Sequence, residues 1–312
     1  MKVLPSVKSL KERGSFMRNM KSEWAYRLMT LPGILVILAF SYVPMFGIAI
    51  AFQKFIPAKG IFGSKWVGLG NFEYMFQLPG VGQVFINTLV IACSKIVLSV
   101  IVPVIFALLL NEARNVAFKR TVQTIVYLPN FLSWVILGTI FVQMFSSMGI
   151  VNQLIRSLGG EPVKFLSDGG WFRFLIIATD QWKNFGFGTI IYLAAIIAIN
   201  PNLYEAAIID GASNIQRIVY ITLPCITPTI ILMLTLSLGN ILNAGFDQVF
   251  NLYNTLVYDS VDIIDTYVYR IGLISMQYGL STAVGLLKSV ISCILIIISY
   301  VLAGRFANYR IF

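Results

Sequence analysis

Long stretches without charged residues dominate the hydropathy pattern of this chain. Residues 28–53 form the first of these stretches and contain no charge at all. A helix needs about 20 mainly apolar residues to cross the hydrocarbon core of a membrane. Five further stretches meet this requirement, although some contain charged residues, among them Asp180 and Lys183 in the fourth span. The pattern therefore predicts six membrane-spanning helices, at about 28–53, 84–110, 122–145, 172–199, 225–246 and 283–303.

The distribution of lysine and arginine predicts how these helices are oriented. Positive residues are more frequent in the connections that lie inside when the N-terminus is inside, and cytoplasmic loops carry such an excess. Residues 1–27 are basic and too long for a typical signal-peptide n-region, so we expect a retained first span. The sequence thus predicts a basic cytoplasmic N-terminal segment, 1–27, and a transmembrane domain, 28–312, with both termini inside the cell.

The composition agrees with an integral membrane protein and excludes several other classes. Of the 312 residues, 58% are hydrophobic and only 12% are charged, about half the charged fraction of a soluble domain. The net charge of +10 is better explained by a membrane surface than by nucleic acid. Histidine is absent, and the three cysteines lie far apart in apolar runs. We therefore predict no catalytic site, no metal site and no bound nucleic acid.

One inner connection, residues 200–224, departs from the pattern of a simple loop. Asn202 precedes Glu205 by three residues, which is the spacing of an N-cap followed by an acid in the first helical turn. Gly211 then interrupts the helical pattern. The run Glu205-Ala206-Ala207 places small residues beside the acids Glu205 and Asp210. Small residues allow close approach, so this corner suits docking into a groove of a partner; a loop that only connects two spans is about equally compatible with the pattern.

A second helix start follows within the same connection. Ser213 and Gln216 have the spacing of a capping box. Pro224 is expected to end this helix and to open the next span. The sequence therefore predicts a helix–turn–helix along the cytoplasmic surface.

The fixed positions of this connection resemble a known family. The run Glu205-Ala-Ala, then Gly211, then Ile221-x-Leu-Pro224 is similar to the EAA loop of ABC importer permeases, at the same spacing. Trp182-Lys-Asn-Phe-Gly186 resembles the carbohydrate branch of that family. Segments around residues 66–69, 265–269 and 281–288 resemble a subgroup associated with complex plant or algal oligosaccharides.

The resemblance implies a fold, a set of partners and a set of coupling residues. The fold would be an all-α, six-helix type I ABC importer permease bundle with cytoplasmic coupling helices, in a prokaryotic cell membrane. The partners would be a second permease subunit, most simply in a heterodimer, two ABC ATPase subunits, an extracytoplasmic solute-binding protein, an oligosaccharide substrate and membrane lipid. The residues that would couple the chain to its ATPase are Glu205, Ala206, Ala207, Asp210, Gly211, Ile221, Leu223 and Pro224. Arg217 lies outside the fixed motif and is either a contact to the ATPase or to anionic lipid, or a solvated side chain.

The sequence contains no nucleotide-binding loop of its own. No Gly-x-x-x-x-Gly-Lys-Ser/Thr pattern occurs, and Gly63-Ser-Lys65 lacks the spacing. The chain is thus expected to hold no cofactor, with ATP and magnesium bound by the partner ATPase.

Charged residues inside the predicted spans need a physical reason, because each costs about 3 kcal/mol on insertion scales. Asp180 and Lys183 are three residues apart and could neutralise one another, an ion pair that is favoured over a substrate contact. Lys95 and Lys288 have no acid near them in sequence, so they would pair with an acid on another helix, extend toward a surface or hold an acidic sugar.

Amide residues suggest a route for a sugar. Asn240, Asn243 and Asp247 recur at three- and four-residue spacing and would form a polar stripe on the fifth span. Trp182 and Asn184 on the fourth span would complement this stripe, because sugars use amides for their hydroxyls and aromatic faces for stacking. Hydrogen bonding between helices is an equally good explanation.

Three functional hypotheses follow. The first is an oligosaccharide importer permease, which is not an enzyme. The second is a secondary transporter of a small polar solute, driven by an ion gradient with Asp180 and Lys183 as a relay, which leaves the amphipathic inner loop unexplained. The third, an intramembrane enzyme, lacks a nucleophile–base pair or a metal cluster in the sequence.

Overall fold

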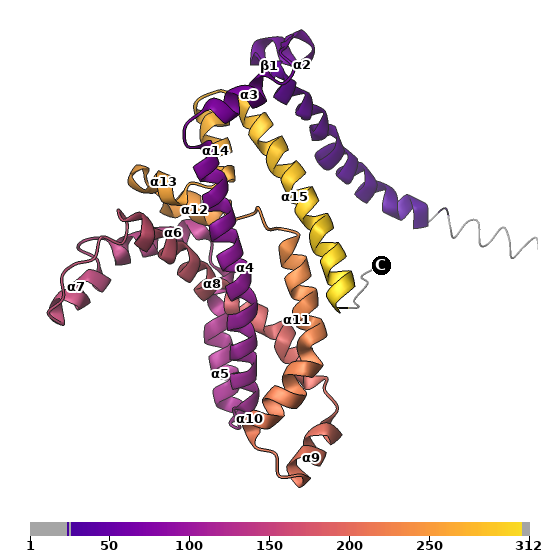
Figure 1. Cartoon of the computed structure of the whole chain (residues 1–312), viewed down its shortest axis with the longest axis vertical. Helices are drawn as coiled ribbons and strands as arrows, with labels where there is room; N and C mark the ends of the chain where they lie inside the picture. Colours follow the sequence, from indigo (N-terminus) through magenta and orange to yellow (C-terminus); the bar gives the residue numbers. More distant parts are fainter. Residues whose placement is uncertain (1–23, 25, 308–312) are drawn as a thin grey trace, which may run out of the picture.

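The computed structural model describes residue 24 and residues 26–307. Most of the predicted segment 1–27, and residues 308–312, lie outside the described residues. Within the described part, five helices are long and apolar enough to cross a membrane. A sixth span is obtained when the helices Gly169–Ile197 and Pro201–Ile209, whose axes differ by 68°, are counted as one. The predicted all-helical membrane bundle is therefore confirmed, and the two short strands are confined to one end (Figure 1).

The first helix, Tyr26–Phe52, stands away from the rest of the molecule (Figure 1). Its last turns are a π-turn, η1 (Leu38–Tyr42), and a 3-10 segment, η2 (Val43–Phe52), with Pro44 near the start of η2. Only the η2 end packs against the body, mainly on the C-terminal helix α15 (Tyr278–Ala307). Most side chains of this helix outside its η2 end are exposed, as expected for a helix whose neighbours are lipid or another subunit.

A small cap follows the first helix at the end opposite the loop 200–224 (Figure 1). Two antiparallel strands, with Gln53 opposite Trp66, bracket two short helical turns. Asn71 ties the cap to the first helix, because its side chain donates to the carbonyls of Ala51 at 2.8 Å and Gln53 at 3.0 Å. The elements are β1 (Gln53–Lys54), η3 (Pro57–Lys59), α2 (Gly60–Gly63), β2 (Lys65–Trp66) and α3 (Gly70–Gln77).

The two long helices α4 (Val81–Glu112) and α8 (Gly169–Ile197) form the centre of the bundle and pack together along much of their length. One buried cluster joins them to the segments that follow α11 (Leu223–Leu238), and another joins them to α11 itself. A third cluster connects α4 to α3, α14 (Ile264–Tyr269) and α15.

The predicted third span, 122–145, contains two helices instead of one continuous helix. These are α5 (Val116–Tyr127) and α6 (Trp134–Phe145), separated by the 3-10 turn η4 (Leu128–Phe131). Pro129 lies near the start of this turn. Proline has no amide hydrogen and clashes with the preceding turn, so the α-helix ends here. The amphipathic helix α7 (Ile150–Ser157) follows α6.

The predicted fifth span, 225–246, is also shorter as a helix. Helix α11 ends at Leu238, and residues 239–245 form an irregular turn before α12 (Phe246–Leu252). Gly245 has φ +94°, a left-handed conformation that glycine adopts without strain. The remaining elements are α9 (Pro201–Ile209), α10 (Asn214–Arg217), η5 (Ile218–Thr222), η6 (Thr255–Val257), α13 (Tyr258–Val261) and η7 (Arg270–Ile274).

Candidate coupling loop and candidate substrate pathway

The loop 200–224 forms a bent helical hairpin that projects from one end of the molecule (Figure 1). Helix α9 begins after Asn200, whose side chain accepts a hydrogen bond from the backbone N–H of Asn202 at 3.0 Å. The prediction that Asn202 is the N-cap was therefore wrong by two residues, because Pro201 already occupies the first helical position. Gly211 turns the chain with φ +77°.

The second helix of the hairpin starts as predicted but does not end as predicted. Ser213 and Gln216 form a capping box, with the Ser213 N–H donating to Gln216 Oε1 at 2.7 Å. The helix then runs without interruption from Asn214 to Leu238, so Pro224 does not end it. The π-turn η5 precedes Pro224 and changes the local hydrogen-bond pattern, which accommodates a residue without an amide hydrogen.

The corner of the hairpin contains a hollow of about 350 Å³. The predicted residues Ala207, Asp210, Gly211 and Ile221 line this hollow. Glu205, Ala206 and Pro224 are exposed and Leu223 is half-buried, and none of these four lines the hollow. Tyr204 holds α9 against the second helix, since its hydroxyl lies 2.8 Å from Thr222 Oγ1.

Arg217, which lies outside the fixed motif, also lines the hollow. Its Nη2 donates to Asn214 Oδ1, whereas its buried Nε has no hydrogen-bond partner within the described residues. Around the corner, Ile209, Ile215 and Tyr220 are largely exposed. The hairpin therefore presents apolar side chains and an unsatisfied buried donor at an end of the bundle, a combination typical of a protein interaction surface.

The amide stripe predicted on the fifth span is not present. Asn240 and Asn243 lie in the irregular turn beyond α11, and Asp247 lies in α12, so the three do not share one helical face. All three side chains are exposed. The spacing was misleading because a three- and four-residue repeat defines a face only while the helix continues.

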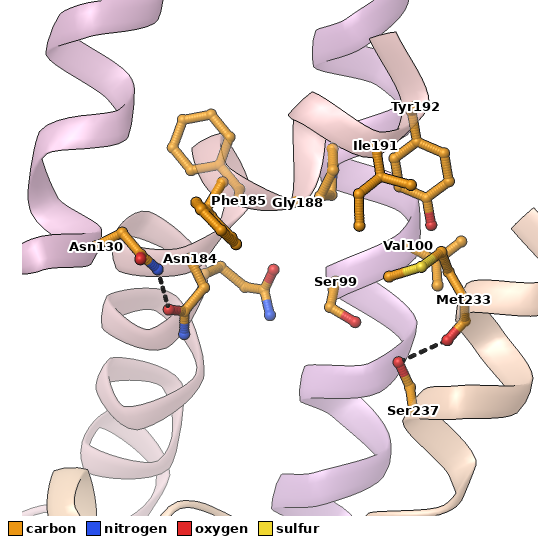
Figure 2. Close-up of a pocket in the computed structure, with 13 residues that line it drawn as sticks. Ser99, Val100, Asn130, Asn184, Phe185, Gly188, Ile191, Tyr192, Met233 and Ser237 are labelled. Carbon is orange, nitrogen blue, oxygen red and sulfur yellow. Dashed lines mark hydrogen bonds between the residues drawn. The ribbon is translucent and has the colours of Figure 1, made fainter. Parts of the chain in front are cut away.

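Trp182 and Asn184 line separate cavities. Trp182 meets Phe141 edge-on, with ring centroids 5.6 Å apart, and lines an apolar groove between α6 and α8. Asn184 instead lines a pocket that η4, α4, α8 and α11 surround (Figure 2). Most of its wall is apolar, but several amides and hydroxyls also line it, and we call it the polar pocket after these groups. Neither of these two cavities is lined by Asn240, Asn243 or Asp247, so the structure does not bring the five predicted substrate-path residues together.

The polar pocket has a volume of about 290 Å³. Asn130 and Asn184 lie side by side at one edge of it, where the Asn130 amide donates to Asn184 Oδ1 at 3.1 Å (Figure 2). Two buried atoms at its wall, Gln181 Oε1 and the Tyr192 hydroxyl, have no hydrogen-bond partner within the described residues. Buried polar atoms are rarely left without a partner, so these are free to meet a polar ligand or water. Ser99 and Ser237 add hydroxyls to the same wall (Figure 2).

Most polar residues of this pocket do not stand out in the sequence. They are single polar residues within apolar runs, and these runs lie far apart along the chain. The residues are Ser99, Asn130, Gln181, Tyr192 and Ser237. All five are polar residues inside predicted spans. This property marks each of them as a candidate, but it does not show that they meet at one pocket.

The predicted pair between Asp180 and Lys183 is not formed. Asp180 Oδ1 instead lies 3.3 Å from Nζ of Lys95, on α4. Lys95 Nζ also donates to Gln248 Oε1 at 2.5 Å and to the carbonyl of Ala244 at 2.7 Å. Helix contact between α4 and α8 brings Lys95 to the acid, so the expectation that Lys95 pairs with an acid on another helix is confirmed.

The other two lysines within the spans have different partners. Lys183 Nζ donates to the backbone carbonyl of Asn130 at 2.6 Å, at the break between α5 and α6. Lys288 on α15 pairs with Asp265 on α14 at 2.5 Å, which confirms the expectation of an acid on another helix.

A cluster of aromatic and charged residues lies between α11 and α15, outside the long apolar helices. Arg270 contacts Asp262 with two hydrogen bonds and stacks 4.3 Å from the Tyr258 ring centroid. Burial opposes the charge of Arg270, but the bonds to Asp262 outweigh it and raise the pKa of the guanidinium. Burial raises the pKa of Tyr253 to about 12, and the neighbouring Tyr258 contributes to this rise through its charge and its hydrogen bond. Arg270 therefore stays charged and Tyr253 neutral at physiological pH.

Comparison with known proteins places this architecture in a family. A family model described as "Binding-protein-dependent transport system inner membrane component" matches residues 99–308. "Protein LplB" of Bacillus subtilis (strain 168) is 43% identical over 293 residues, which cover 94% of this chain and 92% of that protein. The "Polygalacturonan/rhamnogalacturonan transport system permease protein YteP" of the same organism is 44% identical over 286 residues, covering 91% and 89%.

Solved structures resemble the fold closely. A bacterial ABC transporter involved in the import of the acidic polysaccharide alginate has a chain that is 37% identical, with a TM-score of 0.86, covering 94% of this chain and 99% of that one. The same kind of transporter has been solved with an alginate pentasaccharide-bound periplasmic protein, with a TM-score of 0.85. These relatives are transport proteins and not enzymes. The chain therefore belongs to the inner membrane components of binding-protein-dependent transport systems, the permeases of ABC importers.

Proposed function

We propose that this chain is one of two non-identical permease subunits of an ATP-driven importer and forms half of the pathway through which an oligosaccharide enters the cell. An extracytoplasmic binding protein delivers the sugar, and two ATPase subunits, which bind ATP and magnesium, drive the cycle. The chain lies in a prokaryotic cytoplasmic membrane, with both termini inside. Relatives named for sugar transport, including YteP, support this proposal.

The polar pocket is suited to a sugar by its chemistry. Sugar hydroxyls both donate and accept hydrogen bonds, and the wall offers amides, hydroxyls and two unsatisfied polar atoms. Phe185 adds aromatic surface against which sugar C–H groups would pack (Figure 2). The pocket lies in the centre of the bundle, between α4 and α8, where a transported solute would pass.

The exposed hairpin of residues 200–224 is the main support for coupling to an ATPase. It projects beyond the bundle, exposes Ile209 and Ile215 and encloses a hollow beside the unsatisfied Nε of Arg217. A groove on an ATPase subunit would cover these groups. Because the second helix of the hairpin is continuous with α11, a displacement of the corner would move Ser237 at the pocket wall.

Replacing Glu205 with Lys and Gly211 with Val tests this proposal. Valine at φ +77° is strained, and the lysine reverses the charge of the exposed corner, so ATPase binding should weaken and sugar uptake should stop. Uptake by membrane vesicles and co-purification of the ATPase are the measurements. The control is Asn202→Ala, which changes an exposed residue of the same helix outside the motif and should leave both unchanged. Normal uptake by the double variant would contradict the proposal.

The ion-gradient alternative loses its motivating observation in the structure. Its relay required Asp180 and Lys183 to exchange a proton, but Asp180 pairs with Lys95 and Lys183 binds backbone carbonyls. No other observation in the described part of the chain favours it.

A further inference from the structure

Lys183 is a buried cation directly behind the polar pocket. Its side chain lies on α8 and the residue is 7% exposed. Its Nζ donates to the carbonyl of Asn130 at 2.6 Å and lies 3.5 Å from the carbonyl of Pro129. The same atom lies 5.8 Å from the ring centroid of Trp134. Carbonyl oxygens and an aromatic face are both surroundings that suit an ammonium ion.

The charge of Lys183 is not neutralised by an ion pair within the described residues. The neighbouring carboxylate, Asp180, is engaged by Lys95 at 3.3 Å. One carboxylate thus serves two lysines, and the three groups together carry one net positive charge. An unpaired charge in the interior of a membrane protein is costly, so such residues commonly mark the path of a charged substrate.

The excess charge acts on the pocket through Asn130. Asn130 accepts from Lys183 with its carbonyl and lines the pocket with its side chain, which donates to Asn184. The residues that line the pocket are all uncharged (Figure 2). The pocket therefore combines neutral hydrogen-bonding groups with a positive field from behind, in surroundings where a charge is screened only weakly.

We propose that this pocket selects oligosaccharides that carry carboxylates, and that Lys183 determines this selectivity. The sugar hydroxyls meet the amides and hydroxyls of the wall, and a sugar carboxylate supplies the counter-charge that Lys183 lacks. Lys183 acts through its field and through its hold on Asn130, without a direct salt bridge to the sugar. This inference rests on the proposed function, because it needs the pocket to lie on the route of an oligosaccharide.

The test compares two sugars of equal length, one with free carboxylates and one in which each carboxylate is neutralised as a methyl ester. The assembled importer, with its second permease, ATPases and binding protein, is reconstituted in liposomes. ATP-dependent uptake is then measured for an oligogalacturonate and for its neutral methyl ester. The binding protein is the same in every measurement, so a change in the ratio of the two rates between variants belongs to the permease. Equilibrium binding of both sugars to the membrane complex without binding protein gives a second measurement of the same preference.

Three variants and a control should change the preference for the charged sugar in different directions. Lys183→Met should reduce uptake and binding of the charged sugar about tenfold and leave the neutral ester within about twofold, the size expected for one weakly screened charge. Lys183→Arg keeps the charge and should keep the preference. Asp180→Asn removes a negative charge and should raise the preference for the charged sugar. Lys59→Met removes an exposed positive charge far from the pocket and should change nothing.

Several results would overturn the inference. An equal loss for both sugars in Lys183→Met would show that the lysine only supports the helix break. An unchanged ratio of charged to neutral uptake in Lys183→Met would exclude a role for the charge. A lowered preference for the charged sugar in Asp180→Asn would also exclude it. The Asp180→Asn measurement remains valid if Lys183→Met fails to assemble. Equal handling of both sugars by the unmodified importer would refute the selectivity alone. The absence of ATP-dependent uptake for every oligosaccharide tested, charged or neutral, would refute the proposed function as well.

Discussion

Gly186 determines how closely α8 approaches α5. A Cβ at this position would lie 2.3 Å from the carbonyl oxygen of Val126 and 2.6 Å from its side chain. No side chain fits at such distances, and small residues at helix contacts allow this close approach in membrane bundles. The contact places α5 beside the part of α8 that bears Asn184. The shape of the pocket therefore requires a glycine at position 186.

Replacing Gly186 with Leu should therefore destabilise the permease by about 1–3 kcal/mol, because α5 must shift or α8 must bend. Thermal unfolding of the purified complex measures the effect. The matched control is Gly285→Ala in α15, where a Cβ meets nothing within 4 Å. Alanine is a better helix former than glycine, so this change should be neutral or stabilising by up to about 1 kcal/mol. Equal stability of the two variants would contradict the close contact.

At the scale of elements, one turn of α8 supports two interrupted helices. Lys183 binds the carbonyls at the break between α5 and α6. Asp180 holds Lys95, which binds the carbonyl of Ala244 in the turn between α11 and α12. Interrupted helices leave backbone groups without partners, and within a membrane those groups must be satisfied by side chains. These polar residues thus stabilise the breaks that give the pocket its boundaries.

Replacing Lys95 with Met should destabilise the assembled complex by up to about 3 kcal/mol, because the half-buried Asp180 and the buried Gln248 lose their cation. Adding Asp180→Asn to this variant should recover part of the loss, since the uncompensated carboxylate is gone. Thermal unfolding of the single and double variants gives the coupling between the two residues. Additive losses would show that the pair contributes no stability of its own.

At the scale of the whole molecule, the cap of β1, α2 and β2 and the hairpin of α9 and α10 lie at opposite ends (Figure 1). The first helix extends away from the body and exposes apolar side chains along its length. A second permease subunit would cover part of this surface.

The proposed orientation places the cap outside the cell and the hairpin inside. In a background without the three native cysteines, Phe62→Cys in α2 should react with a membrane-impermeant maleimide on intact cells, because Phe62 is fully exposed. Ser213→Cys, exposed in the hairpin, should react only after the membrane is permeabilised. Labelling in the reverse order would contradict both the orientation and the coupling role of the hairpin.

The sequence by itself determined the class of fold of this protein and the two short helices of the hairpin at residues 200–224. Apolar length, the capping box at Ser213 and the bend at Gly211 are local properties, set by solvation and by backbone conformation over a few residues. They are therefore readable from the pattern. The partners of Lys95 and Lys183, the breaks at η4 and beyond Leu238, and the pocket were decided only by the tertiary structure. Each depends on which atoms of remote helices meet, and a buried charge takes the nearest acceptor in space, whatever its distance along the chain.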